Sequence, residues 1–145
     1  MEGSVKMGYR SDVRIMTSKK GFKLLNKYVK DRISKCENKD IYNLLEDIEF
    51  NHENDNAKYF GWNNVKWYYD DVDFIMDGLQ ELKKKDYSFR FARIGENYDD
   101  YEEDYYDSTK EEEQDLLYPC ITRYFLDDMI EQEMDRYKNI EDKEL

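Results

Sequence analysis

The spacing of apolar residues along the chain predicts alternating strands and helices. Apolar and polar side chains alternate over Tyr9–Met16, which is typical of a strand with one buried face. In that strand we expect Val13 to face the core and Arg14 to face solvent. Ser18 is a favourable N-cap, and an apolar stripe at helical spacing then predicts a helix over 19–34.

The rest of the chain continues this alternation, with residues 51–56 reading as a turn. The patterns predict strands over 58–69, 87–94 and 116–126, and helices over 41–48, 70–85 and from 127 onward. Helical crossovers between strands favour an α+β fold. We therefore expect a mixed or antiparallel four-stranded sheet of ferredoxin-like character, with helices packed on it, an acidic loop and an acidic C-terminal helix.

A length of 145 residues suits one domain. Because 40% of its residues are charged, the chain has few aliphatic side chains to build a core. Its 23 aromatic residues can supply the missing apolar surface. We predict three parts, namely a flexible N-terminus over 1–8, a single α+β domain over 9–137 with an acidic insertion at 96–115, and an acidic tail over 138–145.

Charge is distributed unevenly along the chain. Residues 1–35 hold ten basic and three acidic side chains, whereas residues 36–145 hold 13 basic and 32 acidic ones, which gives a net charge of -12. The field of such a protein repels phosphate and attracts cationic surfaces. We therefore expect no direct nucleic-acid binding and a basic protein partner.

The most distinctive segment is 96–115, with eleven acidic residues, four tyrosines and one lysine. Its net charge of -10 gives one charge per roughly 3 Å in a helix and one per roughly 6.6 Å in a strand, against about 1.7 Å for duplex DNA. Only a compact form therefore approaches the charge density of nucleic acid. The alternative is a solvated loop that keeps the protein soluble.

Tyrosine rings between the acids can stack on arginine guanidinium groups, so the segment suits an arginine-rich groove built for nucleic acid. The residues predicted to bind a partner are Tyr98, Asp99, Asp100, Tyr101, Glu102, Glu103, Asp104, Tyr105, Tyr106, Asp107, Glu111, Glu112 and Glu113.

Two other sets of charged residues give alternative functions. Asp70, Asp71 and Asp73, with Asp12, could form the metal centre of a small hydrolase, although aspartates also cap helix N-termini. The lysines of the first helix could bind the acidic body of a second copy and so build an assembly; they are Lys20, Lys23, Lys27 and Lys30. Our principal expectation is a protein that is not an enzyme, with no catalytic residue, cofactor or metal.

Several classes of protein are disfavoured. No apolar run reaches the roughly 18–20 residues that span a bilayer, and the N-terminus lacks the apolar core of a signal peptide. Cys36 and Cys120 lie far apart in the sequence and outside any CxxC motif, which indicates reduced thiols. His52 is the single histidine and lies among polar residues. We expect a cytoplasmic protein, monomeric or dimeric, without a membrane partner.

Three short stretches carry a resemblance, namely MGYRSDV at 7–13, GW and VKWY within 61–68, and FARIGE at 91–96. They resemble a group of small proteins encoded by phages and prophages. The resemblance implies an accessory protein in a bacterial host, a class that includes inhibitors of restriction and CRISPR nucleases. It also implies that residues 1–6 are dispensable, and it supplies no catalytic residue.

Overall fold

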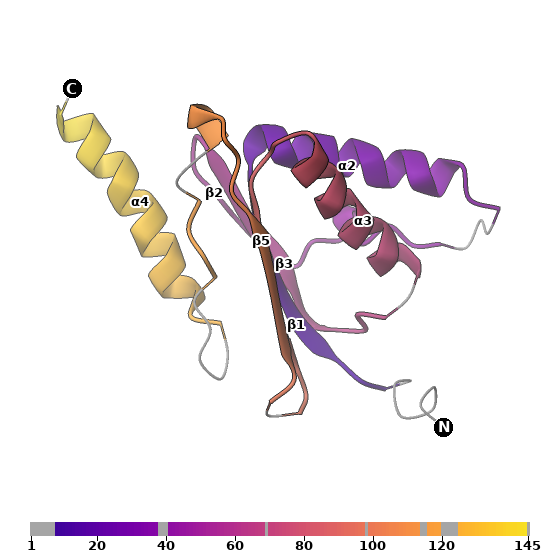
Figure 1. Ribbon diagram of the computed structural model, residues 1–145. Coiled ribbons are helices and arrows are strands. Elements are labelled where there is room, and N and C mark those ends of the chain that lie inside the picture. Colours follow the sequence, from indigo (N-terminus) through magenta and orange to yellow (C-terminus); the bar gives the residue numbers. More distant parts are fainter. Residues whose placement is uncertain are drawn as a thin grey trace.

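The computed structural model describes residues 8–37, 41–68, 70–97, 99–113, 116–119 and 125–144, with the side chains of 70, 71 and 137–144 left out. Its elements are β1 (Ser11–Ser18), α2 (Lys19–Ser34), β2 (Phe50–Glu53), β3 (Ala57–Val65), α3 (Asp70–Lys84), β4 (Phe89–Gly95), β5 (Tyr101–Tyr106) and α4 (Asp127–Glu144). The strands form one antiparallel sheet in the order β2-β3-β1-β4-β5. Helices α2 and α3 lie on one face and α4 on the other (Figure 1), so the fold is α+β as predicted.

The predicted first strand and first helix are confirmed. Strand β1 is the middle of the sheet, where Ile15 lies opposite Phe60 of β3 and Phe91 of β4. Helix α2 begins directly after Ser18, whose hydroxyl accepts a hydrogen bond of 2.9 Å from the Gly21 amide. That bond satisfies one of the amides that a helix N-terminus leaves without a partner.

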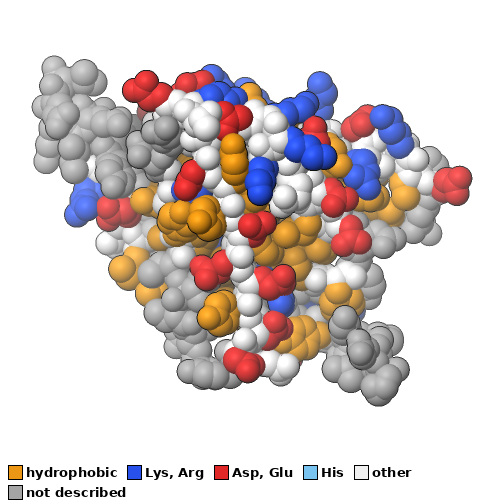
Figure 2. All heavy atoms as spheres, viewed as in Figure 1, with side chains coloured by type: hydrophobic (Ala, Val, Ile, Leu, Met, Phe, Trp, Pro, Cys, Tyr) orange, Lys and Arg blue, Asp and Glu red, His pale blue; other side chains and the backbone are white. Residues whose placement is uncertain are grey.

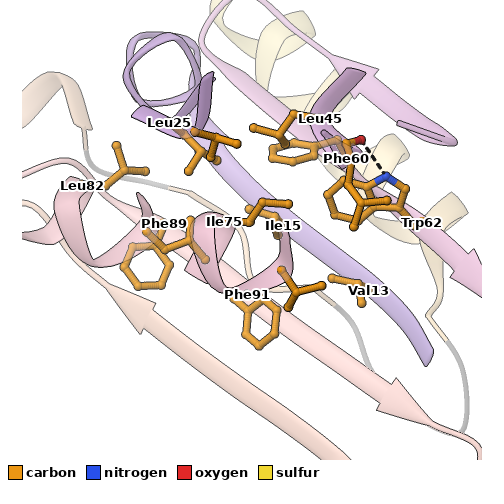
Figure 3. Close-up of a cluster of buried hydrophobic side chains, with 14 residues drawn as sticks. Val13, Ile15, Leu25, Leu45, Phe60, Trp62, Ile75, Leu82, Phe89 and Phe91 are labelled. Atoms are coloured by element: carbon orange, nitrogen blue, oxygen red, sulfur yellow. Dashed lines mark hydrogen bonds between the residues drawn. The ribbon is translucent and has the colours of Figure 1, made fainter. Parts of the chain in front are cut away.

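The main core lies between the sheet and the pair α2 and α3 (Figure 3). Its largest side chains are the fully buried Phe60 and Trp62 of β3, and the Trp62 indole donates a 3.1 Å hydrogen bond to the Leu44 carbonyl. The two helices approach closely at Gly78, where a Cβ would lie only 2.5 Å from the Leu25 side chain. Apolar burial therefore holds this face together.

The opposite face contains a buried arginine, so the expectation that Arg14 faces solvent is wrong. Arg14 is 2% exposed, and its guanidinium binds the Asp127 carboxylate at 2.7 Å and the Asn63 side-chain oxygen at 2.8 Å. Burial raises the pKa of Tyr59, and the nearby Asp127 carboxylate, which accepts from its hydroxyl, raises it further. These bonds hold the start of α4 against the sheet. Further along the same helix, Met134 is buried.

The sheet has five strands, and two of them lie where the sequence predicted none. Strand β2 occupies part of the predicted turn at 51–56, and β5 runs through the predicted acidic loop. Every residue except proline has both a main-chain donor and a main-chain acceptor for bonds to a neighbouring strand, so an edge strand needs no apolar alternation. The predicted helix at 41–48 is a short 3-10 turn at Leu44–Glu46, capped by the Asn43 side chain.

The predicted strand at 116–126 is not found at 116–119, and residues 120–124 of that prediction lie outside the described part of the chain. The expected flexible N-terminus also lies outside it, apart from Gly8. Helix α4 continues to Glu144, so most of the predicted acidic tail belongs to this helix. None of the described helices is long and apolar enough to cross a membrane.

Candidate interaction site along the acidic edge of the sheet

The β4–β5 hairpin places the acidic segment at one edge of the sheet. In its register Ala92 lies opposite Glu103, and Arg90 lies opposite Tyr105. Residues 101–105 are all exposed. Figure 2 shows Asp and Glu side chains in a column over β5, whereas Lys and Arg side chains gather toward α2 and α3. The structure therefore arranges the acidic residues along an edge strand.

The extended backbone of β5 sets the spacing of its charges. The strand has three acids among its six residues, Tyr101–Tyr106, which is one charge per roughly 6.6 Å at about 3.3 Å per residue. Duplex DNA carries one charge per about 1.7 Å. Of the two forms considered from the sequence, β5 adopts the sparser one, so its charge alone does not reproduce a phosphate backbone.

Arg93 of β4 pairs with two of the predicted partner-binding acids. Its guanidinium binds Asp100 at 2.7 Å and also Glu102. The Arg93 hydrogen bonds, followed by the bond from the Tyr9 hydroxyl, hold the pKa of Asp100 below its usual value. These two carboxylates tie the hairpin together, and together with the single positive charge of Arg93 they keep a net charge of -1.

Arg90 plays the same part at the other end of β5. It is 4% exposed, and its guanidinium binds Asp107 and the carbonyls of Phe89 and Tyr106. The guanidinium carbon lies 4.1 Å from the centre of the Tyr118 ring and 5.8 Å from that of Tyr105. Tyr105 therefore lies near an arginine of its own chain, whereas the predicted stacking concerned arginines of a partner.

Tyr106 and the residues after it are fastened to the turn between α3 and β4. The Asp86 carboxylate accepts from the Tyr106 hydroxyl at 2.7 Å, and from the amide and hydroxyl of Thr109. The Thr109 hydroxyl and amide, and then the Tyr106 hydroxyl, hold the pKa of Asp86 well below its usual range. Asp86 has a φ of 64°, which aspartate tolerates better than most residues.

Glu113 does not belong to the exposed surface, although the sequence placed it there. It is 2% exposed and accepts hydrogen bonds from the Ser18 hydroxyl and, at 3.1 Å, from the Ser88 amide. Since Ser18 caps α2, the carboxylate lies near the positive end of that helix dipole. Glu113, the last of the acids predicted to bind a partner, therefore stabilises the fold.

The remaining acids form what we call the acidic edge, defined as Asp99, Glu103, Asp104, Glu111 and Glu112. All five are exposed, and none forms an ion pair with the part of the chain that the structure describes. Tyr101, which is 59% exposed, lies beside them. Tyr98, also predicted to bind a partner, lies outside the described residues.

The residues of the two alternative functions lie elsewhere. Among the described side chains no three Asp, Glu, His or Cys residues gather to hold a metal ion. Asp73 is exposed, and Asp12 accepts a 2.8 Å bond from the Asn64 amide. The side chains of Asp70 and Asp71 are not described. The four lysines predicted to bind a second copy are exposed on α2, and no described residue pairs with them; they are Lys20, Lys23, Lys27 and Lys30.

Sequence reasoning missed the importance of Arg90 and Arg93, which decide which acids stay free. An available signal was the position of arginine among apolar residues in a strand, because a buried guanidinium requires carboxylate or carbonyl partners. His52, in contrast, lies beside Asp135 of α4 at 3.3 Å, and Cys36 is a free thiol.

Comparisons with protein-family models, curated proteins and solved structures found no match for this chain.

Proposed function

We propose that this protein is an inhibitory binding protein rather than an enzyme, and that its acidic edge occupies the basic nucleic-acid-binding groove of a bacterial defence nuclease. A CRISPR effector is the preferred target and a restriction nuclease the other. The proposal places the protein in the cytoplasm of a bacterial host, as the phage-type sequence motifs suggest. Nucleic acid would then be excluded by charge and by bulk.

The observation that carries the proposal is a set of five exposed carboxylates on β5 and in the segments before and after it, which form no ion pair with described residues, in a protein with a net charge of -12. Acids beside Arg90 and Arg93 are already paired within the protein, so the acids without an ion pair are those most open to a cationic partner. Because β5 is sparser in charge than duplex DNA, shape and hydrogen bonding must supplement charge in such a complex.

We also propose that β1, α2, β2, β3, α3 and β4 form a ferredoxin-like unit. Their chain order and the sheet order β2-β3-β1-β4 support this, since two split β-α-β units pair in this way. Strand β5 and helix α4 are then additions to the unit. Glu103 and Asp104 of the acidic edge lie on β5, and its other three acids lie in the segments before and after this strand.

The test is capture of a partner from nuclease-treated bacterial lysate by the intact protein and by a variant that removes four free charges; its substitutions are Asp99→Asn, Glu103→Gln, Glu111→Gln and Glu112→Gln. Asp104 is retained, because its carboxylate accepts from the Tyr105 amide. The captured protein is identified, purified and assayed for nucleic-acid binding. We expect the intact protein to displace nucleic acid, and the variant to bind the partner about tenfold more weakly.

A matched control removes four exposed acids that lie off the edge and form no ion pair with described residues; its substitutions are Glu37→Gln, Glu46→Gln, Asp47→Asn and Asp73→Asn. It has the same net charge as the first variant, and we expect nearly full affinity. Equal binding by both variants, or binding that does not weaken between low and high salt, contradicts the proposal.

A second candidate is self-assembly, and the unpaired lysines of α2 favour it. Two such copies would join head to tail through the lysine face of one and the acidic edge of the other. Size measured by light scattering at low and high salt decides this: assembly predicts a larger species at low salt, and a monomer at both excludes it.

A further inference from the structure

The acidic edge also presents main-chain groups. The Gly95 amide donates to the Asp100 carbonyl at 2.7 Å, which starts the ladder between β4 and β5. In an antiparallel pair, residues alternate between those bonded to the partner strand and those whose N–H and C=O point away from it. Counting from Asp100, the residues of β5 that point away are Tyr101, Glu103 and Tyr105.

One of these outward amides is already covered. The Tyr105 N–H donates to the carboxylate of its neighbour Asp104 at 2.8 Å, which confirms that this amide points away from β4. No described residue bonds to the main-chain N–H of Tyr101 or Glu103 across this edge. Within the described chain β5 pairs only with β4, so the first half of its outer edge is open.

The charges of this edge decide which strand could join it. Two copies of β5 placed side by side would bring the acids of 102–104 against one another, and like charges opposite each other are destabilising. A strand with Lys or Arg would meet opposite charge at the same positions. Glu103 lies at the centre, with both an unpaired carboxylate and an outward amide.

We propose that β5 binds a cationic extended segment of the partner by strand addition, through the main-chain groups of Tyr101 and Glu103. This proposal deepens the proposed function, because it names how the acidic edge would grip a partner. Main-chain hydrogen bonds give affinity in this mode and side chains give specificity, which compensates for the sparse charge of the strand.

The first experiment separates the amide of Glu103 from its charge. Glu103→Pro removes the outward N–H, and proline is tolerated at an edge position that donates no bond to its neighbour strand. Glu103→Gln removes the charge and keeps the N–H. Both are tested with the intact chain against a nine-residue peptide of alternating threonine and lysine, labelled for fluorescence polarisation. Thermal unfolding and far-ultraviolet circular dichroism check that both variants fold.

Strand addition predicts about tenfold weaker binding of the peptide for Glu103→Pro, as expected for lost main-chain bonds and a blocked edge. It predicts a smaller loss for Glu103→Gln that disappears at high salt. Should the proline variant unfold, the same peptide with N-methyl groups on alternate residues tests the intact protein. In one of the two methylation registers, binding should fall by about the same factor.

The outcomes separate this inference from the proposed function. If Glu103→Pro binds the peptide as well as Glu103→Gln, or if neither N-methylated peptide loses affinity, strand addition is wrong. If the four-charge variant loses the lysate partner while Glu103→Pro keeps it, the proposed function stands without strand addition. If the four-charge variant and its control bind that partner equally, the proposed function fails whatever the peptide does.

Discussion

The two faces of the sheet are stabilised in different ways. The face under α2 and α3 is built from apolar side chains such as Phe60 and Trp62, which are fully buried. Among the described residues, the face under α4 has a smaller apolar cluster, and two buried guanidinium groups, those of Arg14 and Arg90, also lie on this face. Apolar burial therefore holds α2 and α3 on the sheet. The start of α4 and the end of β5 are held in addition by ion pairs with buried arginines.

This difference explains how so acidic a chain folds. Arginines on β1 and β4 bind carboxylates of the later segments, Asp100, Asp107 and Asp127 among them. Part of the negative charge thus holds β5 and α4 in place. What remains unpaired on the acidic edge is the part that can attract a partner.

The largest effect should come from the apolar face. Phe60 contacts Phe22 with ring centres 5.1 Å apart and Trp62 with centres 6.1 Å apart. Phe60→Ala should lower the free energy of unfolding by about 3–5 kcal/mol, because it leaves a cavity in a packed core. Urea unfolding at pH 7 measures this. A loss under about 1 kcal/mol would show that this face is not the main source of stability.

A somewhat smaller effect is expected on the ionic face. Arg14→Met removes the ionic partner of Asp127, whose side chain is only 21% exposed. We therefore expect the free energy of unfolding to fall by about 2–4 kcal/mol. Amide hydrogen exchange in α4 should accelerate while α2 stays protected. A double-mutant cycle with Asp127→Asn should show coupling. If the losses of unfolding free energy in the two single mutants simply add in the double mutant, the Arg14–Asp127 pair does not hold α4 to the sheet.

The smallest effect concerns the attachment of the acidic strand at Asp86. Since its pKa is lowered in the folded protein, the unfolded chain takes up the proton first as the pH falls. Its contribution to stability is therefore complete above about pH 5. The contribution declines as the pH falls below about 3.9, the pKa of an aspartate in the unfolded chain. Asp86→Asn keeps the shape of the side chain and tolerates the positive φ.

We expect Asp86→Asn to be less stable than the wild type at pH 7, and the difference in urea midpoint to narrow between pH 5 and pH 3. The control is Asp47→Asn, an exposed acid without an ion pair to any described residue, which should not change this pH dependence. A difference between Asp86→Asn and wild type that stays constant with pH would contradict the assigned role of Asp86.

Periodic patterns in the sequence predicted the elements of the apolar face well. The helix at 19–34 and its Ser18 cap are confirmed, and α3 begins at Asp70 as expected. The acidic segment was harder, because a run of Asp, Glu and Tyr has no apolar period that marks a strand. Its exposed acids could be named from the sequence, but which of them remain unpaired could not.

The sequence alone determined the α+β composition, the amphipathic helices and the excess of negative charge, because these depend on neighbours along the chain. Only the tertiary structure decided that the acidic segment forms an edge strand, that Arg14 is buried, and that Glu113 supports α2. Those outcomes depend on pairing between residues far apart in sequence, where main-chain bonds and buried charges find partners that no local pattern records.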